Sequence, residues 1–137
     1  MQHIRYRDFF VLLATEGRHR FFEEEKGMKD VRLVPISVGG YSVSQRGGRP
    51  HVRIDDDTFR SLRAYFLDPA LHRSAARLVG EFYAIPFEPY GPVKVQLFKL
   101  LGAVNELRRR AGYQPVPKSA VWLKRRYVKP FAPPAPR

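Results

Sequence analysis

The sequence predicts a helix-dominated α+β fold, with an N-terminal helix and a β-hairpin followed by about four helices in a small bundle. Apolar residues recur at helical spacing through residues 55–129, and two short runs before residue 55 alternate apolar and polar residues around a glycine pair. The length of 137 residues is that of one ordinary domain. We therefore expect a single domain over residues 1–129, mixed over 1–54 and helical over 55–129, with a proline-rich extended tail over 130–137.

The N-terminal segment contains an apolar run at residues 9–14. Such a run fits a buried helix or a buried strand, and periodicity does not separate the two over so short a segment. We interpret it as a helix with Asp8 as its N-cap. Residues 31–38 are rich in β-branched side chains and predict a strand, which Pro35 places at a sheet edge or a bulge.

A β-hairpin is expected next. Residues 41–44 and 51–54 both alternate apolar and polar side chains, which is typical of strands with one buried face. The glycine pair Gly47-Gly48 between them supplies the positive φ angles that a tight turn requires. The tip of the hairpin therefore bears Arg46 and Arg49.

Two helices are expected before residue 85. The acids Asp55 to Asp57 offer N-caps and first-turn charges for the first helix, because carboxylates favour a helix N-terminus. Asp68 and Pro69 predict the start of the second helix, as its N-cap and first helical residue. The apolar stripe of this second helix consists of Leu71, Ala75, Leu78, Val79 and Phe82.

Two more helices are expected after a proline-rich connection. Pro92 opens the third helix and Gly112 closes it. Its apolar stripe consists of Val93, Leu97, Leu100, Leu101, Val104 and Leu107. The fourth helix is expected at about residues 118–128.

The charge is unevenly distributed. The chain carries 25 Lys and Arg against 13 Asp and Glu, a formal net charge of +12. Basic and acidic residues number 10 and 6 over residues 1–54, 6 and 6 over 55–100, and 9 and 1 over 101–137. A neutral middle with a strongly basic end indicates a localised surface for a polyanion, which favours nucleic acid as the partner.

The expected last helix is the first candidate binding site. At 100° per residue, the only tryptophan of the chain falls among cations on one narrow arc. The residues of this face are Lys118, Trp122, Arg125 and Lys129, with Arg126 at its edge. Cations that neutralise the backbone and an aromatic ring that stacks on bases suit a single strand. The alternative is that Trp122 packs against a neighbouring element and the cations are only solvated.

Two further basic groups are candidate contacts. Their residues are Arg108, Arg109 and Arg110 in the first group, and Arg46, Arg49, Arg53 and His51 in the second. The first group ends a helix, where the helix dipole favours cations whatever the function. The second group forms a basic finger with small residues at its tip, which suits a groove or a single-stranded backbone. An exposed loop that is basic without function is the alternative.

The sequence offers no catalytic motif, and we expect no enzyme, no cofactor and no metal site. The chain has no Cys, its four His lack metal-ligand spacing, and it contains neither a phosphate-binding glycine loop nor a nucleophile elbow. Asp55, Asp56 and Asp57 would suit a divalent ion, but three consecutive acids do not face one point. Asp68 and His72 are four residues apart and are interpreted as a surface hydrogen bond.

The sequence also predicts a location. The longest apolar run is far shorter than a membrane span, and the first residues do not resemble a signal peptide. The absence of Cys favours a reducing compartment. We expect a cytoplasmic protein with no membrane contact.

The main hypothesis is a non-catalytic, largely sequence-independent protein that binds the backbone of DNA or RNA, with single strands favoured and other protein subunits as further partners. In length, charge and helical content alone, the chain resembles small subunits of RNA-guided effector complexes and plasmid or phage accessory factors. One alternative is a protein–protein assembly subunit that uses basic patches and the proline-rich tail. The other is a metal-dependent nuclease centred on Asp55 to Asp57.

Overall fold

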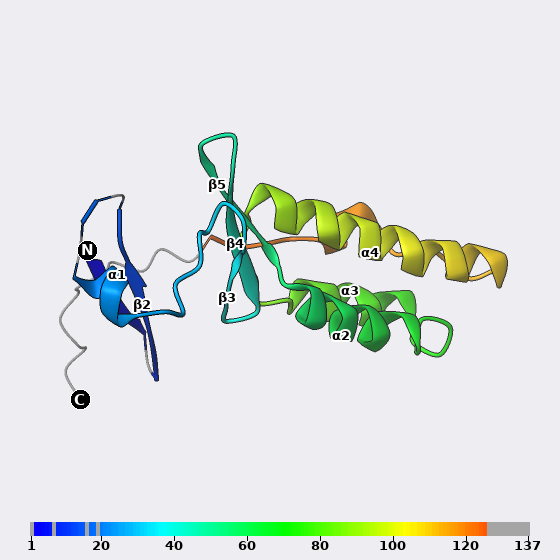
Figure 1. Cartoon of the computed structure of the whole chain (residues 1–137). Helices are drawn as coiled ribbons and strands as arrows, with labels where there is room; N and C mark the ends of the chain where they lie inside the picture. The colour runs from blue at the N-terminus through cyan, green and yellow to red at the C-terminus, as the bar shows by residue number, and fades with distance from the viewer. Residues whose placement is uncertain (1, 7, 16, 19, 126–137) are drawn as a thin grey trace, which may run out of the picture. The chain divides into compact units, whose positions relative to one another are not determined.

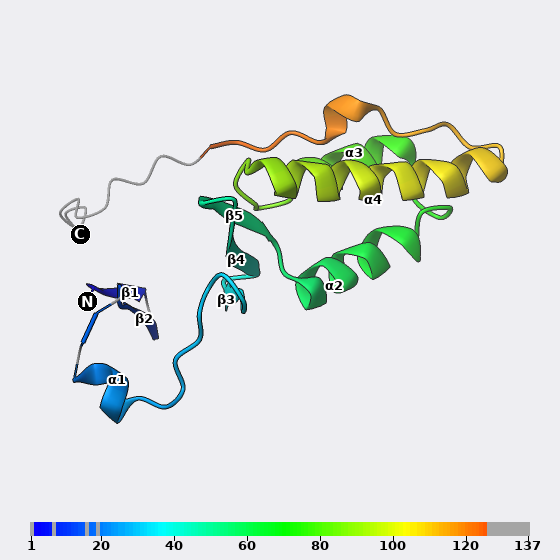
Figure 2. The ribbon, with the colours of Figure 1, turned by 45° about the horizontal axis from the view of Figure 1, so that its top comes forward.

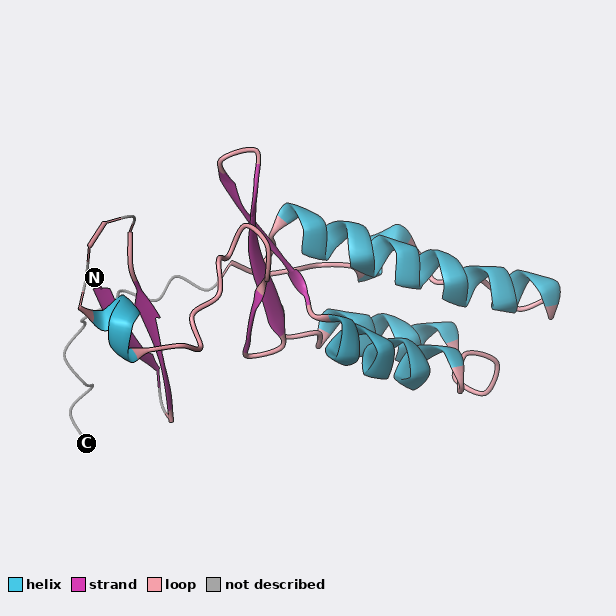
Figure 3. Cartoon of the chain, in the orientation of Figure 1, coloured by secondary structure: helices cyan, strands magenta, loops and turns pink. Residues whose placement is uncertain are grey.

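The computed structural model describes residues 2–6, 8–15, 17–18 and 20–125. The chain divides into two compact units, Met1–Asp30 and Val31–Arg137. The described residues form two antiparallel sheets, four α-helices and a short 3-10 helix, with more residues in helices than in strands (Figures 1 and 3). The α+β class is therefore confirmed. Arg126, Lys129 and the predicted tail at 130–137 lie outside the described residues.

The first unit begins with a β-hairpin where we predicted a helix. Strands β1 (Gln2–Tyr6) and β2 (Phe9–Leu13) pair antiparallel. The predicted helix over residues 9–14, with Asp8 as its N-cap, is therefore wrong. Its aromatic and β-branched residues favour a strand. Pairing with the preceding segment gives the backbone N–H and C=O groups of both segments hydrogen-bond partners. One helical turn, α1 (Phe21–Glu24), follows.

The second unit begins with a three-stranded antiparallel sheet. Its strands β3 (Ile36–Val38), β4 (Tyr41–Arg46) and β5 (Arg49–Ile54) lie side by side in chain order. The strand predicted over residues 31–38 is present only in its last three residues, because residues 31–34 form a turn and a bend. Pro35 lies directly before the edge strand, at a position where its missing N–H costs no ladder bond.

Both connections within this sheet are two-residue glycine turns. The φ angles are +56° and +83° at Gly39 and Gly40, and +56° and +73° at Gly47 and Gly48. Positive φ at both central residues gives a turn whose twist matches that of the flanking strands. The predicted hairpin is therefore confirmed.

Helix α4 (Gly91–Arg110) packs against β5. The side chain of Gln96 pairs with the backbone of Ile54: its Oε1 accepts a hydrogen bond from the N–H at 2.8 Å, and its Nε2 donates to the carbonyl at 3.0 Å. The amide therefore substitutes for a neighbouring strand at this sheet edge. The predicted helix bounds are confirmed, since Pro92 lies in the first turn and Gly112, at φ +75°, follows the last.

Helix α2 (Asp56–Leu67) is confirmed with the predicted acidic start. An Asp55 side-chain oxygen accepts a hydrogen bond from the Thr58 N–H at 2.7 Å, which is the geometry of an N-cap. The next helix, α3 (Ala75–Tyr83), is capped in the same way by Ser74.

The start that we predicted for α3 is wrong. Asp68 is the C-cap of α2, and the chain from Pro69 to Arg73 forms a turn instead of a helix. The carbonyls of Ala70 and Arg73 accept hydrogen bonds from the distant side chain of Arg108. These tertiary bonds hold the residues that follow Asp68 outside a helix.

The helix predicted over residues 118–128 is also wrong in residues 118–125, the part of it that the structure describes. A 3-10 turn, η1 (Lys118–Ala120), is followed by extended chain through residue 125. The side chain of Asn105 donates to the Val116 carbonyl at 2.8 Å and accepts from the Val116 N–H at 2.7 Å. These two bonds fix the chain before Lys118 against α4. Val121 and Leu123 then both pack against the core, which an α-helix does not allow, because residues two apart on a helix point in nearly opposite directions.

The buried core lies in the second unit. Helices α2, α3 and α4 lie to one side of the sheet, and the described C-terminal segment returns along α4 toward it (Figures 1 and 2). The largest fully buried side chains are Phe66, Phe82, Ile54, Leu78, Leu97, Leu100, Val93, Val104 and Val116. None of the helices in the described part of the chain has both the length and the apolar content that crossing a membrane requires.

Candidate nucleic-acid interface

The β4–β5 register sorts the side chains of this ribbon onto two faces. Tyr41 lies opposite Ile54, and both belong to the face that packs on the core. Because side chains alternate along a strand, the residues between them point to the other face. The pairs of that other face are Ser42 with Arg53, Ser44 with His51, and Arg46 with Arg49. We name Arg46, Arg49, His51 and Arg53 of this face the basic ribbon face.

The tip of the ribbon is open. Arg46 and Arg49 are exposed, and neither forms an ion pair with any residue that the structure describes. A Cβ placed on Gly47 or Gly48 would meet nothing within 4 Å. Two exposed arginines are therefore directly opposite each other in the register, at a point where a large partner can approach.

The base of the ribbon is acidic. Arg53 forms an ion pair with Asp56 at 3.0 Å, and Asp57 pairs with Arg60 at 3.1 Å. Asp55 caps α2, so each of the three consecutive acids has a different partner. The described residues contain no group of three His, Cys, Asp or Glu side chains that could hold a metal ion. The structure thus gives these acids helix-capping and pairing roles.

The arginine triplet at the end of α4 is divided between the interior and the surface. Arg108 is 3% exposed and donates to the carbonyls of Gln114 at 2.7 Å, Ala70 at 2.7 Å and Arg73 at 2.8 Å. Its donors are occupied by the fold, so we do not include Arg108 in the interface.

The other two members of the triplet remain at the surface. Arg109 and Arg110 are exposed and pair with Glu106 at 3.8 Å and 2.9 Å. Exposed pairs of this kind contribute little to stability and open readily, so both cations remain accessible to a phosphate.

The C-terminal segment presents its residues in strand-like alternation. Val121 and Leu123 pack against the core. Trp122, which lies between them in the sequence, and Lys124, which follows them, are exposed. The helical arc that we predicted around Trp122 is therefore absent, although Trp122 itself is 54% exposed. Lys124 was missed, because the alternation of residues 121–124 was interpreted with a helical period.

Two further cations of this segment are exposed. Lys118 is exposed on η1, and Arg125 lines a small hollow with Glu88, Pro89 and Tyr90.

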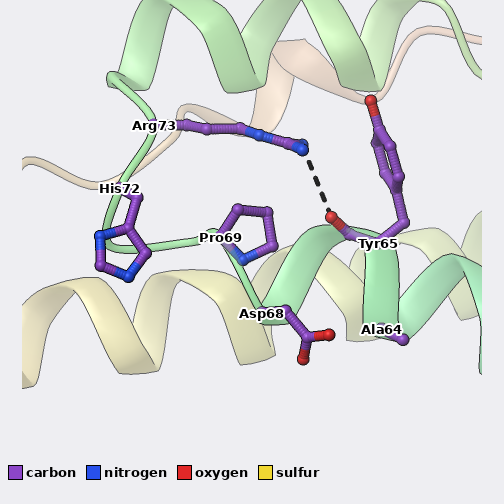
Figure 4. A pocket seen from close by; sticks show the side chains of 6 residues that line it. All are labelled: Ala64, Tyr65, Asp68, Pro69, His72 and Arg73. Carbon is purple, nitrogen blue, oxygen red and sulfur yellow. Dashed lines mark hydrogen bonds between the residues drawn. The ribbon is translucent and has the colours of Figure 1, made fainter.

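A shallow pocket lies at the junction of α2 and the turn that follows it (Figure 4). Arg73 reaches toward Tyr65, whose carbonyl it contacts at 3.5 Å and whose ring centre lies 4.6 Å from the guanidinium carbon. Arg73 also pairs with Glu81 at 2.6 Å. The hydrogen bond predicted between Asp68 and His72 is absent among the described contacts, and the two side chains point in different directions in Figure 4. This pocket is organised by structural contacts of Arg73.

Comparison of the chain with protein-family models, with curated proteins and with solved structures finds no match.

Proposed function

We propose that the protein binds nucleic acid through the basic ribbon face, as a non-catalytic module that contacts the phosphate backbone without reading its sequence. The observation that carries the proposal is the strand register, which collects Arg46, Arg49, His51 and Arg53 on the face opposite the core. Arg is well suited to this task because its planar guanidinium forms paired hydrogen bonds with phosphate oxygens. The two tip arginines have no competing acid among the described residues.

The distribution of charge supports the same surface. Residues 1–30 contain six basic and six acidic residues, whereas residues 31–137 contain 19 and seven. The whole excess of positive charge therefore belongs to the unit that carries the ribbon. A polyanion gains affinity from each cation that replaces a condensed counterion, so this unit is the favoured one for nucleic acid.

Exposed residues outside the ribbon supply secondary contacts in this proposal. They are Arg109, Arg110, Lys118, Trp122, Lys124 and Arg125. Cations of this kind add affinity for any sequence, because phosphate contacts position a protein without specifying bases. Association with further protein subunits in a nucleoprotein complex, in the cytoplasm, is part of the same proposal.

The test is a salt series of binding to labelled DNA and RNA, followed by fluorescence anisotropy. The unmodified protein should lose affinity steeply between about 50 and 200 mM salt. Replacing both Arg46 and Arg49 by Ala should weaken binding to every sequence and lower the slope of log affinity against log salt by about two. The matched control replaces Arg60 and Arg63, two exposed arginines of α2, and removes the same charge.

Equal losses in the two double variants would show that only net charge matters and would contradict a site on the ribbon. Binding that does not respond to salt would contradict phosphate contact altogether. Incubation of the same samples with Mg²⁺, followed by a denaturing gel, tests the nuclease alternative. Strands cut by the unmodified protein would replace the proposal of a non-catalytic module.

An assembly role is the second candidate, and the first unit favours it. No side chain that the structure describes in residues 1–30 is buried, and Ile4, Phe10 and Leu13 are more than 40% exposed. This unit is electrically neutral and carries apolar surface, which suits a protein partner better than a polyanion. Salt-independent association with a partner protein, lost on truncation of residues 1–30, would support it.

A further inference from the structure

We infer that the ligand of the basic ribbon face is double-stranded DNA, with the tip of the ribbon inserted in the major groove. This inference rests on the proposed function and specifies its substrate class. The major groove of B-form DNA is about 12 Å wide and about 8.5 Å deep, and it admits a two-stranded antiparallel ribbon.

The outer half of the ribbon has the shape that such a groove admits. Strand β3 pairs only with Tyr41 to Val43, so residues 44–46 and 49–51 form a two-stranded extension without a third strand. In Figures 1 and 3 the turn of this ribbon projects beyond the neighbouring helices. Three residues of strand span about 10 Å. The free length of the ribbon thus matches the depth of the groove.

The small tip allows close approach. The turn consists of Gly47 and Gly48, around which the structure leaves open space. Arg46 is the last residue of β4 and Arg49 is the first residue of β5. The two are opposite each other in the register. Both side chains leave the ribbon on the same face, so an inserted tip would bring two guanidinium groups together to the phosphates that line the groove.

The acids at the base set a limit to insertion. Asp56 and Asp57 have exposed side chains, and Asp56 neutralises Arg53. Arg53 is four residues from Arg49 along β5, or about 14 Å. Phosphates are therefore attracted at the tip and repelled at the base, so the ribbon enters by its outer half and stops before the acids.

The outer half lacks the rings that bind single strands. Proteins that hold single strands stack bases on aromatic side chains, and residues 44–50 contain no Phe, Tyr or Trp. The ring of His51 is half-buried and its Nδ1 is fully buried, so it offers no open stacking face. Our preference for single strands depended on a cationic helix around Trp122, and the structure has extended chain there.

The groove geometry also separates DNA from RNA. The major groove of A-form RNA is deep and too narrow for side chains to read. A ribbon that needs a groove about 12 Å wide is therefore excluded from duplex RNA but not from duplex DNA.

The experiment measures the affinity of the full chain for duplex DNA, single-stranded DNA and duplex RNA of equal length. At moderate salt, we expect the affinity for duplex DNA to exceed the affinities for single-stranded DNA and duplex RNA by at least about tenfold. We attribute this difference to the shape of the groove as well as to the charge of the phosphates. A second duplex, in which glucosylated hydroxymethylcytosine fills the major groove, should lose this advantage. Tyr83→Ala, at an exposed aromatic side chain outside the proposed contacts, should leave duplex affinity unchanged. The double replacement of Arg46 and Arg49 should abolish the preference.

The outcomes separate this inference from the function it rests on. Binding to single strands that equals or exceeds binding to duplex DNA would overturn the inference and leave the proposed function intact. Equal binding of the glucosylated and plain duplexes, or of duplex RNA and duplex DNA, would do the same. Failure to bind any of the polymers at low salt would overturn both.

Discussion

At the residue scale, Arg108 shows how position on a helix decides the role of a charge. Three arginines follow one another at the end of α4, yet one is buried and two are exposed. Arg108 lies four residues after Val104 and seven after Leu101, which are both buried. The same spacing that defined the apolar stripe therefore placed Arg108 on the inner face.

Replacing Arg108 by Ala should destabilise the protein strongly. Three buried or half-buried carbonyls would lose a charged donor, and hydrogen bonds to charged groups are worth about 1.5–3 kcal/mol each. We expect a loss of at least about 3 kcal/mol in the free energy of unfolding, measured by urea denaturation. Arg109→Ala is the matched control, with an expected change within about 0.5 kcal/mol. Similar stability of the two variants would contradict the structural role of Arg108.

At the element scale, α4 carries the core on one face. Leu97 is 1% exposed, whereas Val95, two residues earlier, is 56% exposed. Leu97→Ala should cost about 2–5 kcal/mol of stability, because it removes buried methyl groups and leaves a cavity. Val95→Ala should change stability by no more than about 0.5 kcal/mol. A small loss for Leu97→Ala in thermal or urea unfolding would mean that this helix presents a different face to the core.

Elements with local signals were predicted from the sequence, and elements decided by distant contacts were not. The β4–β5 turn, the acidic start of α2 and both ends of α4 follow from glycine, cap and proline patterns that act within a few residues. The last predicted helix failed because Val121 and Leu123 both pack against the core that other elements form. No pattern within residues 118–128 shows that contact.

The N-terminal prediction failed for a different reason. The apolar run of β2 has no period of its own, so its structure depends on a pairing partner. Gln2–Tyr6 supplies that partner, but alternates too weakly to be recognised beforehand. Of the candidate site, the hairpin tip could be predicted, because its glycines and arginines are adjacent. His51 and Arg53 were also grouped with that tip from the sequence, but the half-burial of His51 and the ion pair of Arg53 with Asp56 could not be predicted.

At the scale of the whole molecule, the two units differ in how they are stabilised. All the buried hydrophobic residues among the described part of the chain belong to residues 54–120. Removal of residues 1–30 should therefore leave the unfolding midpoint of the rest unchanged within about 2 °C, as measured by circular dichroism. Duplex binding should also persist in the shortened protein. A large fall in the midpoint would mean that the first unit contributes to the core of the second.

The core of the second unit closes late in the chain. Val116 and Ala120 are buried with Ile54 and Leu97, and Asn105 holds Val116 in place. On the ribosome, the strands that carry the basic face are made well before these last core residues. At about 5–20 residues per second, the interval between Ile54 and Val116 lasts several seconds. Throughout that interval the nascent chain carries these arginines beside ribosomal RNA before the last residues of its core have been made.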